Sequence, residues 1–200
     1  TDAVDPNVRD SIVTAISLLG ELGANVTDVS IPLIADSASI SAAVTAVDAV
    51  NVHRDGIRDY LDQYDHNIQI RLLTGSIMPA QAHQKAVRLR EMLRCQIMDV
   101  LGQFDVLVMP TSSIPASPLP TQAGVNSKAE VLQGFAGRRG FTAPFNLASL
   151  PALSVGCGFT PDNLPVGLQI AGKAFDESSI FRVAHAYQQA TNWHLRRPPL

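Results

Sequence analysis

The residues that most often perform covalent chemistry are present, but their spacing forms none of the common catalytic patterns. No serine stands in Gly-x-Ser-x-Gly, the strained turn that presents the nucleophile of many hydrolases. No glycine-rich sequence of the phosphate-binding or dinucleotide-binding type occurs. Ser76, Ser112 and Ser113 lie in turn-like sequence and are predicted to form turns. These residues alone therefore predict no nucleophilic centre.

Candidate bases and metal ligands are equally scattered. The five histidines include no i, i+4 pair and lie near no pair of cysteines, so no metal site is predicted. The lysines Lys85, Lys128 and Lys173 stand in polar or helical sequence, where a solvated ammonium is expected rather than a desolvated base. Cys95 and Cys157 are predicted to be buried free thiols in a reducing, cytoplasmic compartment. No cofactor is expected.

Apolar periodicity predicts the helices that would position any site. Residues 5–22 begin with Asp-Pro, a strong helix start, and carry one apolar stripe that ends before Gly23, a predicted C-terminal cap. A second stripe covers residues 82–101 and ends at Gly102. Residues 37–61 are rich in small and apolar side chains and predict one or two buried helices.

Strand patterns alternate with these helices. A short strand is predicted at residues 26–31, and the continuous apolar run at 106–109 predicts a strand buried within a sheet. Residues 152–159 and 166–170 flank a Thr-Pro-Asp-Asn turn and predict a hairpin, and Asp176 is placed to cap a last helix. The pattern predicts an α/β fold with a sheet flanked by helices.

Composition indicates a core-rich chain with no nucleic-acid or membrane partner. Of 200 residues, 46% are hydrophobic and 16% are charged, against about 25% charged in an average soluble domain. The low charge indicates a surface partly covered by further chain or by a partner. The net charge of -3 gives no basic footprint, and Arg88, Arg90 and Arg94 are predicted to lie on a solvated helix face. No continuous apolar run approaches 18 residues, so no membrane-spanning helix is predicted, and no signal peptide is recognised.

Four blocks occur in the order and spacing of the amidase-signature family. Residues 104–111 resemble its D-x-L-x-x-P-T strand and turn, and residues 142–155 resemble its T-x-P-x-N-L-x-G-x-P-A-x-S-V block. Residues 164–172 match its L-P-x-G-L-Q-x-x-G hairpin, and residues 22–32 are similar to its L-G-A-x-V stretch that ends in proline. Together the blocks cover nearly the whole chain.

This resemblance implies a hydrolase of amides, built on a mixed β-sheet flanked by helices. In that family a serine nucleophile, a second serine in a cis peptide and a lysine base lie in a Gly/Ser-rich signature of the N-terminal half. No such run occurs here, so residues 1–200 are expected to be the C-terminal portion of the domain and no catalytic residue is assigned. The expected partners are the N-terminal catalytic half, a small-molecule amide and, in a homodimer, a second copy.

The resemblance also assigns the substrate-binding residues Arg71, Arg139 and Thr142. Arg71 stands where the glutamine-hydrolysing member has the arginine that grips the substrate carboxylate, although a surface arginine near a helix start is the alternative. Arg139 replaces an aspartate before the block that Thr142 opens. An arginine there would repel an ammonium group and favour an anion or a carbonyl oxygen. A stand-alone amidase acting on a neutral or anionic amide is therefore favoured.

Two alternatives remain open from the sequence. The chain could be a non-catalytic fragment or subunit that serves as a binding or regulatory module. It could also be a portion of the A subunit of a glutamine amidotransferase.

Overall fold

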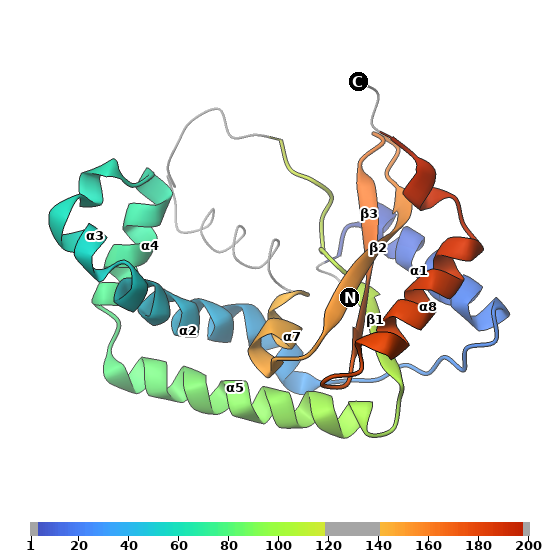
Figure 1. Ribbon diagram of the computed structural model, residues 1–200, viewed down its shortest axis with the longest axis horizontal. Helices are drawn as coiled ribbons and strands as arrows, with labels where there is room; N and C mark the ends of the chain where they lie inside the picture. The colour runs from blue at the N-terminus through green and yellow to red at the C-terminus, as the bar shows by residue number, and fades with distance from the viewer. Residues whose placement is uncertain (1–3, 119–140, 198–200) are drawn as a thin grey trace.

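A computed structural model describes residues 4–118 and 141–197, in which helices cover both faces of a small sheet (Figure 1). The strands are β1 (Val106–Pro110), β2 (Ala152–Phe159) and β3 (Pro165–Gly172). Their order is β1-β3-β2, and both pairings are antiparallel. The predicted α/β class, with a sheet flanked by helices, is confirmed.

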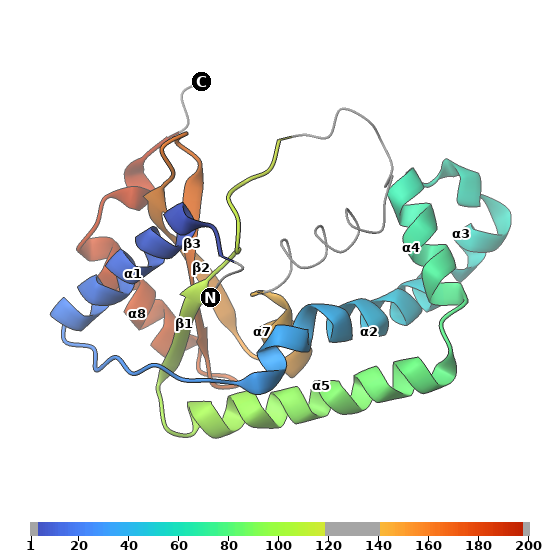
Figure 2. The same ribbon diagram turned by 180° about the vertical axis from the view of Figure 1, so that it is seen from behind.

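The helices form two groups about this sheet. In Figures 1 and 2, α1 and α8 lie on one side, whereas α2, α5 and α7 lie on the other and α3 and α4 extend beyond the far end of α2. Their bounds are α1 (Pro6–Glu21), α2 (Ser37–Val52), α3 (Arg54–Asp59), α4 (His66–Ser76), α5 (Ala80–Leu101), α7 (Ala143–Ala148) and α8 (Glu177–Gln189). Short 3-10 helices occupy Pro32–Asp36 (η1), Leu61–Gln63 (η2) and Trp193–Leu195 (η3).

Local capping signals fix the helix ends where the sequence predicted them. The Asp5 carboxylate accepts hydrogen bonds from the first turn of α1, and Gly23 follows that helix with a φ of 99°. Gly102 caps α5, and the Asp176 side chain accepts from the Ser179 amide at the start of α8. These interactions involve residues only a few positions apart, which is why the sequence reveals them.

The sheet separates two hydrophobic cores. Alternate strand residues pack against α1 and α8: Val155, Cys157, Val166, Leu168 and Ile170. The opposite face packs on α5, α7 and the start of α2 through a second set: Ile40, Leu93, Ile97, Leu107, Phe145, Leu147 and Ala171. Because successive side chains of a strand point to opposite faces, residues between those of the first core face the second.

Three local predictions are wrong. Residues 26–31 form no strand but an irregular link, with Val26 47% exposed and Val29 42% exposed; a strand requires a neighbour to pair with, and the described residues provide none there. Residues 37–61 are helical, but α2 buries few of its side chains. Cys95 is exposed on α5, and only Cys157 is buried.

The segment Pro32–Val52 bears on the expectation that no membrane is involved. An 18-residue window within these 21 residues has a mean hydropathy of 1.5, so the segment is long and apolar enough to cross a membrane by length and composition. The serines, the threonine and the two aspartates, Asp36 and Asp48, interrupt the apolar run and hid this feature from a search for continuous runs. In the fold, α2 packs against α4, α5 and α7 while 17% of this window is buried.

Candidate functional site

Among the described residues, helices cover the second face of the sheet along only part of its length. At one end, Leu107 of β1 and Ala171 of β3 belong to the core beneath α5 and α7. Towards the other end the same face presents Ser154 of β2, Gly167 of β3 and Thr111, which follows β1. Within the described residues, an open hollow of about 580 Å³ lies over these three residues.

Two hydroxyl groups and a glycine form the floor of this hollow. The Thr111 and Ser154 hydroxyl oxygens lie 2.6 Å apart and share a hydrogen bond. The Thr111 amide donates to the Gly167 carbonyl, which extends the pairing of β1 and β3 by one residue. A Cβ on Gly167 would lie 2.6 Å from the Ser154 oxygen and 2.8 Å from the Thr111 oxygen. Glycine is therefore required for the pair to form.

The described lining of the hollow can contact a neutral polar group but includes no base that would activate a nucleophile. Its lining combines segment 111–117 with the ends of β2 and β3 and with Val8 of α1, and among the described residues no charged side chain takes part. One hydroxyl of the pair donates to the other, so one O–H and several lone pairs remain for a ligand. A serine nucleophile needs an adjacent base, and no lysine or histidine lines the described part of the hollow.

Of the three residues predicted to bind substrate, the two that the structure describes, Arg71 and Thr142, lie on separate elements. Thr142 stands before the first turn of α7, and its hydroxyl forms no hydrogen bond with the described residues. Arg71 is exposed on α4, which packs at the end of α2 far from the sheet (Figures 1 and 2). Neither lines the described part of the hollow, and Arg139 lies outside the described residues.

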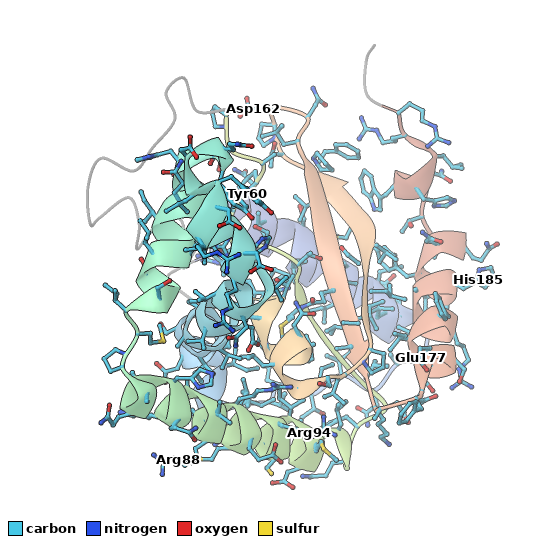
Figure 3. The ribbon with its side chains drawn as sticks, turned by 60° about the vertical axis from the view of Figure 1, so that its left-hand side comes forward. Tyr60, Arg88, Arg94, Asp162, Glu177 and His185 are labelled. Carbon is cyan, nitrogen blue, oxygen red and sulfur yellow. The ribbon has the colours of Figure 1, made fainter. Side chains whose placement is uncertain are left out.

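The arginines of α5 have two different environments. Arg90 donates through Nε to the Leu147 carbonyl at 2.8 Å, and Arg94 donates to the Ala148 carbonyl. Both side chains are half-buried, so they cap the carbonyl end of α7 instead of forming the solvated face predicted for them. Figure 3 shows Arg94 towards α7 and Arg88 on the outer side of α5, where the prediction is correct.

Comparison with known proteins identifies the family. The sequence model described as amidase matches residues 1–181, which is most of the chain. The chain belongs to the amidase family. The A subunit of the glutamyl-tRNA(Gln) amidotransferase from Geobacillus stearothermophilus is 32% identical over 223 aligned positions. That alignment covers all of this chain and 44% of the relative, so the chain spans less than half the length of the curated relatives it matches.

Solved structures agree with the fold. The A subunit of the glutamyl-tRNA(Gln) amidotransferase from Thermotoga maritima is 29% identical, with a TM-score of 0.68 over 94% of this chain and 40% of that protein. A crystal structure of an amidase gives a TM-score of 0.79 over 94% of this chain and 42% of its own, at 22% identity. The amidase-family resemblance and the fold expected from it are therefore confirmed.

The hollow itself was missed from the sequence. Thr111 and Ser154 are 43 residues apart, and each stands in a different block of the resemblance, neither of which assigns it a role. The local sequence gives one signal, since Gly156 and Gly167 stand in adjacent strands and pair directly. Paired glycines in neighbouring strands mark a place where a ligand or another backbone can approach closely.

Proposed function

We propose that this chain forms part of the substrate pocket of an enzyme that hydrolyses a carbon–nitrogen amide bond. The open hollow with the Thr111–Ser154 hydroxyl pair on its floor carries this proposal. The pair can bind an amide group by accepting from its N–H or donating to its carbonyl oxygen. The serine nucleophile, the cis-peptide serine and the lysine base that the family resemblance implies would lie outside these 200 residues.

The part of the sheet face that no described helix covers supports a partner of a particular kind. The described floor is neutral and lacks a base, so it fits a role in binding and orienting a substrate while another polypeptide segment performs the chemistry. We expect the N-terminal portion of an amidase domain to pack over this face. The relatives support that arrangement, because this chain corresponds to less than half of their length.

Arg71, Arg139 and Thr142 remain proposed substrate-binding residues. The Arg71 side chain is exposed and donates no hydrogen bond to the described residues, so its guanidinium is available to a carboxylate. The hydroxyl of Thr142, which bonds to no described residue, is available in the same way. With Arg139 in place of an acidic residue, we expect neutral or anionic amides to be preferred over substrates that carry an ammonium group near the scissile bond.

The test is amide hydrolysis by the natural full-length protein and its variants at the hollow. Ser154→Ala removes one hydroxyl, and Gly167→Ala displaces both. We expect kcat/KM to fall by about 10- to 100-fold, because misplacing a substrate by about 1 Å costs on the order of 100-fold in rate. Michaelis constants and turnover numbers for short aliphatic and aryl amides provide the measurement.

Gly158→Ala is the matched control. Gly158 lies on β2 but faces α1, and its added Cβ would lie 2.8 Å from the Ser11 hydroxyl oxygen. The Gly158→Ala substitution therefore introduces a similar clash, but on the face of the sheet that packs against α1. If all three variants lose activity in proportion to their loss of stability, the hollow is not part of the substrate pocket.

The A subunit of a glutamine amidotransferase is the second candidate. The 32% identity to the Geobacillus stearothermophilus protein favours it. Ammonia release from glutamine by the full-length protein, compared with ammonia release from a neutral amide, distinguishes this candidate from a stand-alone amidase. Efficient glutaminase activity that depends on further subunits would support the second candidate, whereas activity on the neutral amide alone supports the first.

A further inference from the structure

The segment that carries Thr142 is held at both ends by side chains from other elements. At its start, the Gln169 side-chain amide of β3 donates to the Phe141 carbonyl at 2.7 Å. At its end, Arg90 and Arg94 of α5 donate to the last carbonyls of α7. The short helix between these anchors is almost wholly buried. Its position is thus set by the sheet on one side and by α5 on the other.

Gln169 is the anchor that connects this segment with the hollow. The register pairs Gln169 directly with Ser154 on β2, whose hydroxyl forms part of the hollow floor. Gln169 lies on the same face of β3 as Gly167 and Ala171, and its side chain is only 4% exposed. One buried amide group therefore lies between the hydroxyl pair and the backbone that precedes Thr142.

Packing alone does not account for a glutamine at this place. Burying a polar side chain costs free energy unless it is hydrogen-bonded, and an apolar residue of similar shape is often neutral or better for stability. The hydrogen bond to Phe141 does what an apolar residue cannot, since it is directional and fixes one backbone atom against the sheet. A role in positioning explains the residue type.

We infer that Gln169 is a positioning residue, which sets the place of Thr142 and the start of α7 relative to the hollow. This inference rests on the proposed function, because the hollow is the pocket in which position matters. Without the hydrogen bond, the Phe141 carbonyl loses its fixed donor and the segment can shift by a fraction of an ångström. A displacement of that size at a binding site lowers catalytic efficiency without unfolding the protein.

Gln169→Glu provides the sharpest test, because its hydrogen bond depends on pH. A protonated carboxyl group can donate to the Phe141 carbonyl, whereas a carboxylate only accepts and repels it. Burial beside a carbonyl oxygen raises the pKa of such a carboxyl group above its ordinary value of about 4.3. Arg90 and Arg94 of α5 are charged groups that face the other end of this segment, where both donate to the last carbonyls of α7.

The first measurement is hydrogen exchange at the amides of residues 142–147 other than Pro144, in the natural full-length protein. At each pH the exchange rate of the variant is divided by that of the wild type. For Gln169→Glu we expect a ratio near one at pH 5 that rises at least fivefold by pH 8. For Gln169→Met, which donates at no pH, the ratio is high throughout. Catalytic efficiency towards a neutral amide should fall by 10-fold or more whenever the ratio is high.

Gln96→Glu is the matched control. The Gln96 side chain of α5 accepts a hydrogen bond from the Leu33 amide through Oε1, and a carboxylate can still accept there. Its exchange ratio should stay near one across the pH range. Unchanged exchange and kinetics in both Gln169 variants would overturn the inference, as would an exchange ratio that does not depend on pH in Gln169→Glu. If the exchange ratios change as expected but the wild-type protein hydrolyses no amide, the proposed function is refuted and the positioning role of Gln169 is not.

Discussion

The two cysteines occupy opposite environments. Cys95 is exposed on α5, whereas the Cys157 thiol on β2 is buried and donates to the Val166 carbonyl. Burial raises the pKa of Cys157 to about 12, so its reactive thiolate form is scarce at neutral pH. In the native chain at pH 8, we expect a disulfide reagent such as dithionitrobenzoate to modify one thiol rapidly.

Denaturation should expose the second thiol, and the variant Cys95→Ser should show no fast reaction in its native state. Rapid modification of two thiols in the folded chain would contradict the burial of Cys157. The absorbance of the coloured product that the reagent releases gives a readout independent of any enzymatic activity of the protein.

Alkaline pH should weaken the core between the sheet and α8. Burial also raises the pKa of Tyr187 to about 12, and the neighbouring Cys157 adds to that shift. Both groups stay neutral in the folded chain at pH values where they ionise in the unfolded chain, so their stability contribution is complete below about pH 9 and is lost as the pH rises towards 12.

The measurement is the urea midpoint between pH 7 and 11. It should fall above pH 9 in the wild type, and the fall should be shallower in Cys157→Ala. Cys95→Ser is the control and should follow the wild type, because its thiol is exposed. A midpoint that is constant up to pH 11 would contradict the prediction.

At the scale of elements, helix packing makes two glycines respond oppositely to the same change. A Cβ on Gly75 of α4 would lie 2.2 Å from the Ala46 carbonyl oxygen of α2, so the helices must separate. Gly20 of α1 has no neighbour within 4 Å of the added atom. We expect Gly75→Ala to lower the free energy of unfolding by about 1–3 kcal/mol. Gly20→Ala should raise it by about 0.5–1 kcal/mol. Urea titrations of both variants check this, and equal effects would contradict it.

Elements with local signals could be predicted, and elements that depend on distant partners could not. The carboxylates of Asp5 and Asp176 accept hydrogen bonds from amides within the next three residues, so the local sequence was sufficient to predict where α1 and α8 begin. Residues 26–31 have a strand-like composition but no described neighbour, and pairing is not encoded within six residues. The capping of α7 by Arg90 was equally hidden, since its acceptor is 57 residues away.

At the scale of the whole molecule, the described residues form an open hollow that no described lysine or histidine lines. A fluorophosphonate probe labels serines that an adjacent base activates. We expect no labelling of a polypeptide limited to residues 1–200, and labelling of the natural full-length protein if it carries further chain with the nucleophile. Labelling of the 200-residue polypeptide, abolished by one serine substitution, would show that the nucleophile lies within it.

The family was accessible from the sequence because four blocks occur in register, and the matched model confirms it. The hollow was not accessible, because its floor forms only when three strands align. The identity of Thr111, Ser154 and Gly167 is plain in the sequence, but their contact depends on the antiparallel register of the whole sheet.

The central place of β3 has a consequence for synthesis on the ribosome. β3 is the last described strand to be translated, yet it is the one with which both β1 and β2 pair. About 60 residues separate the end of β1 from the end of β3, which takes roughly 3 to 12 s to translate. During that interval the nascent β1, an almost entirely apolar segment, lacks its described partner. For that time β1 is an unpaired apolar segment of the kind that makes an emerging chain prone to aggregate.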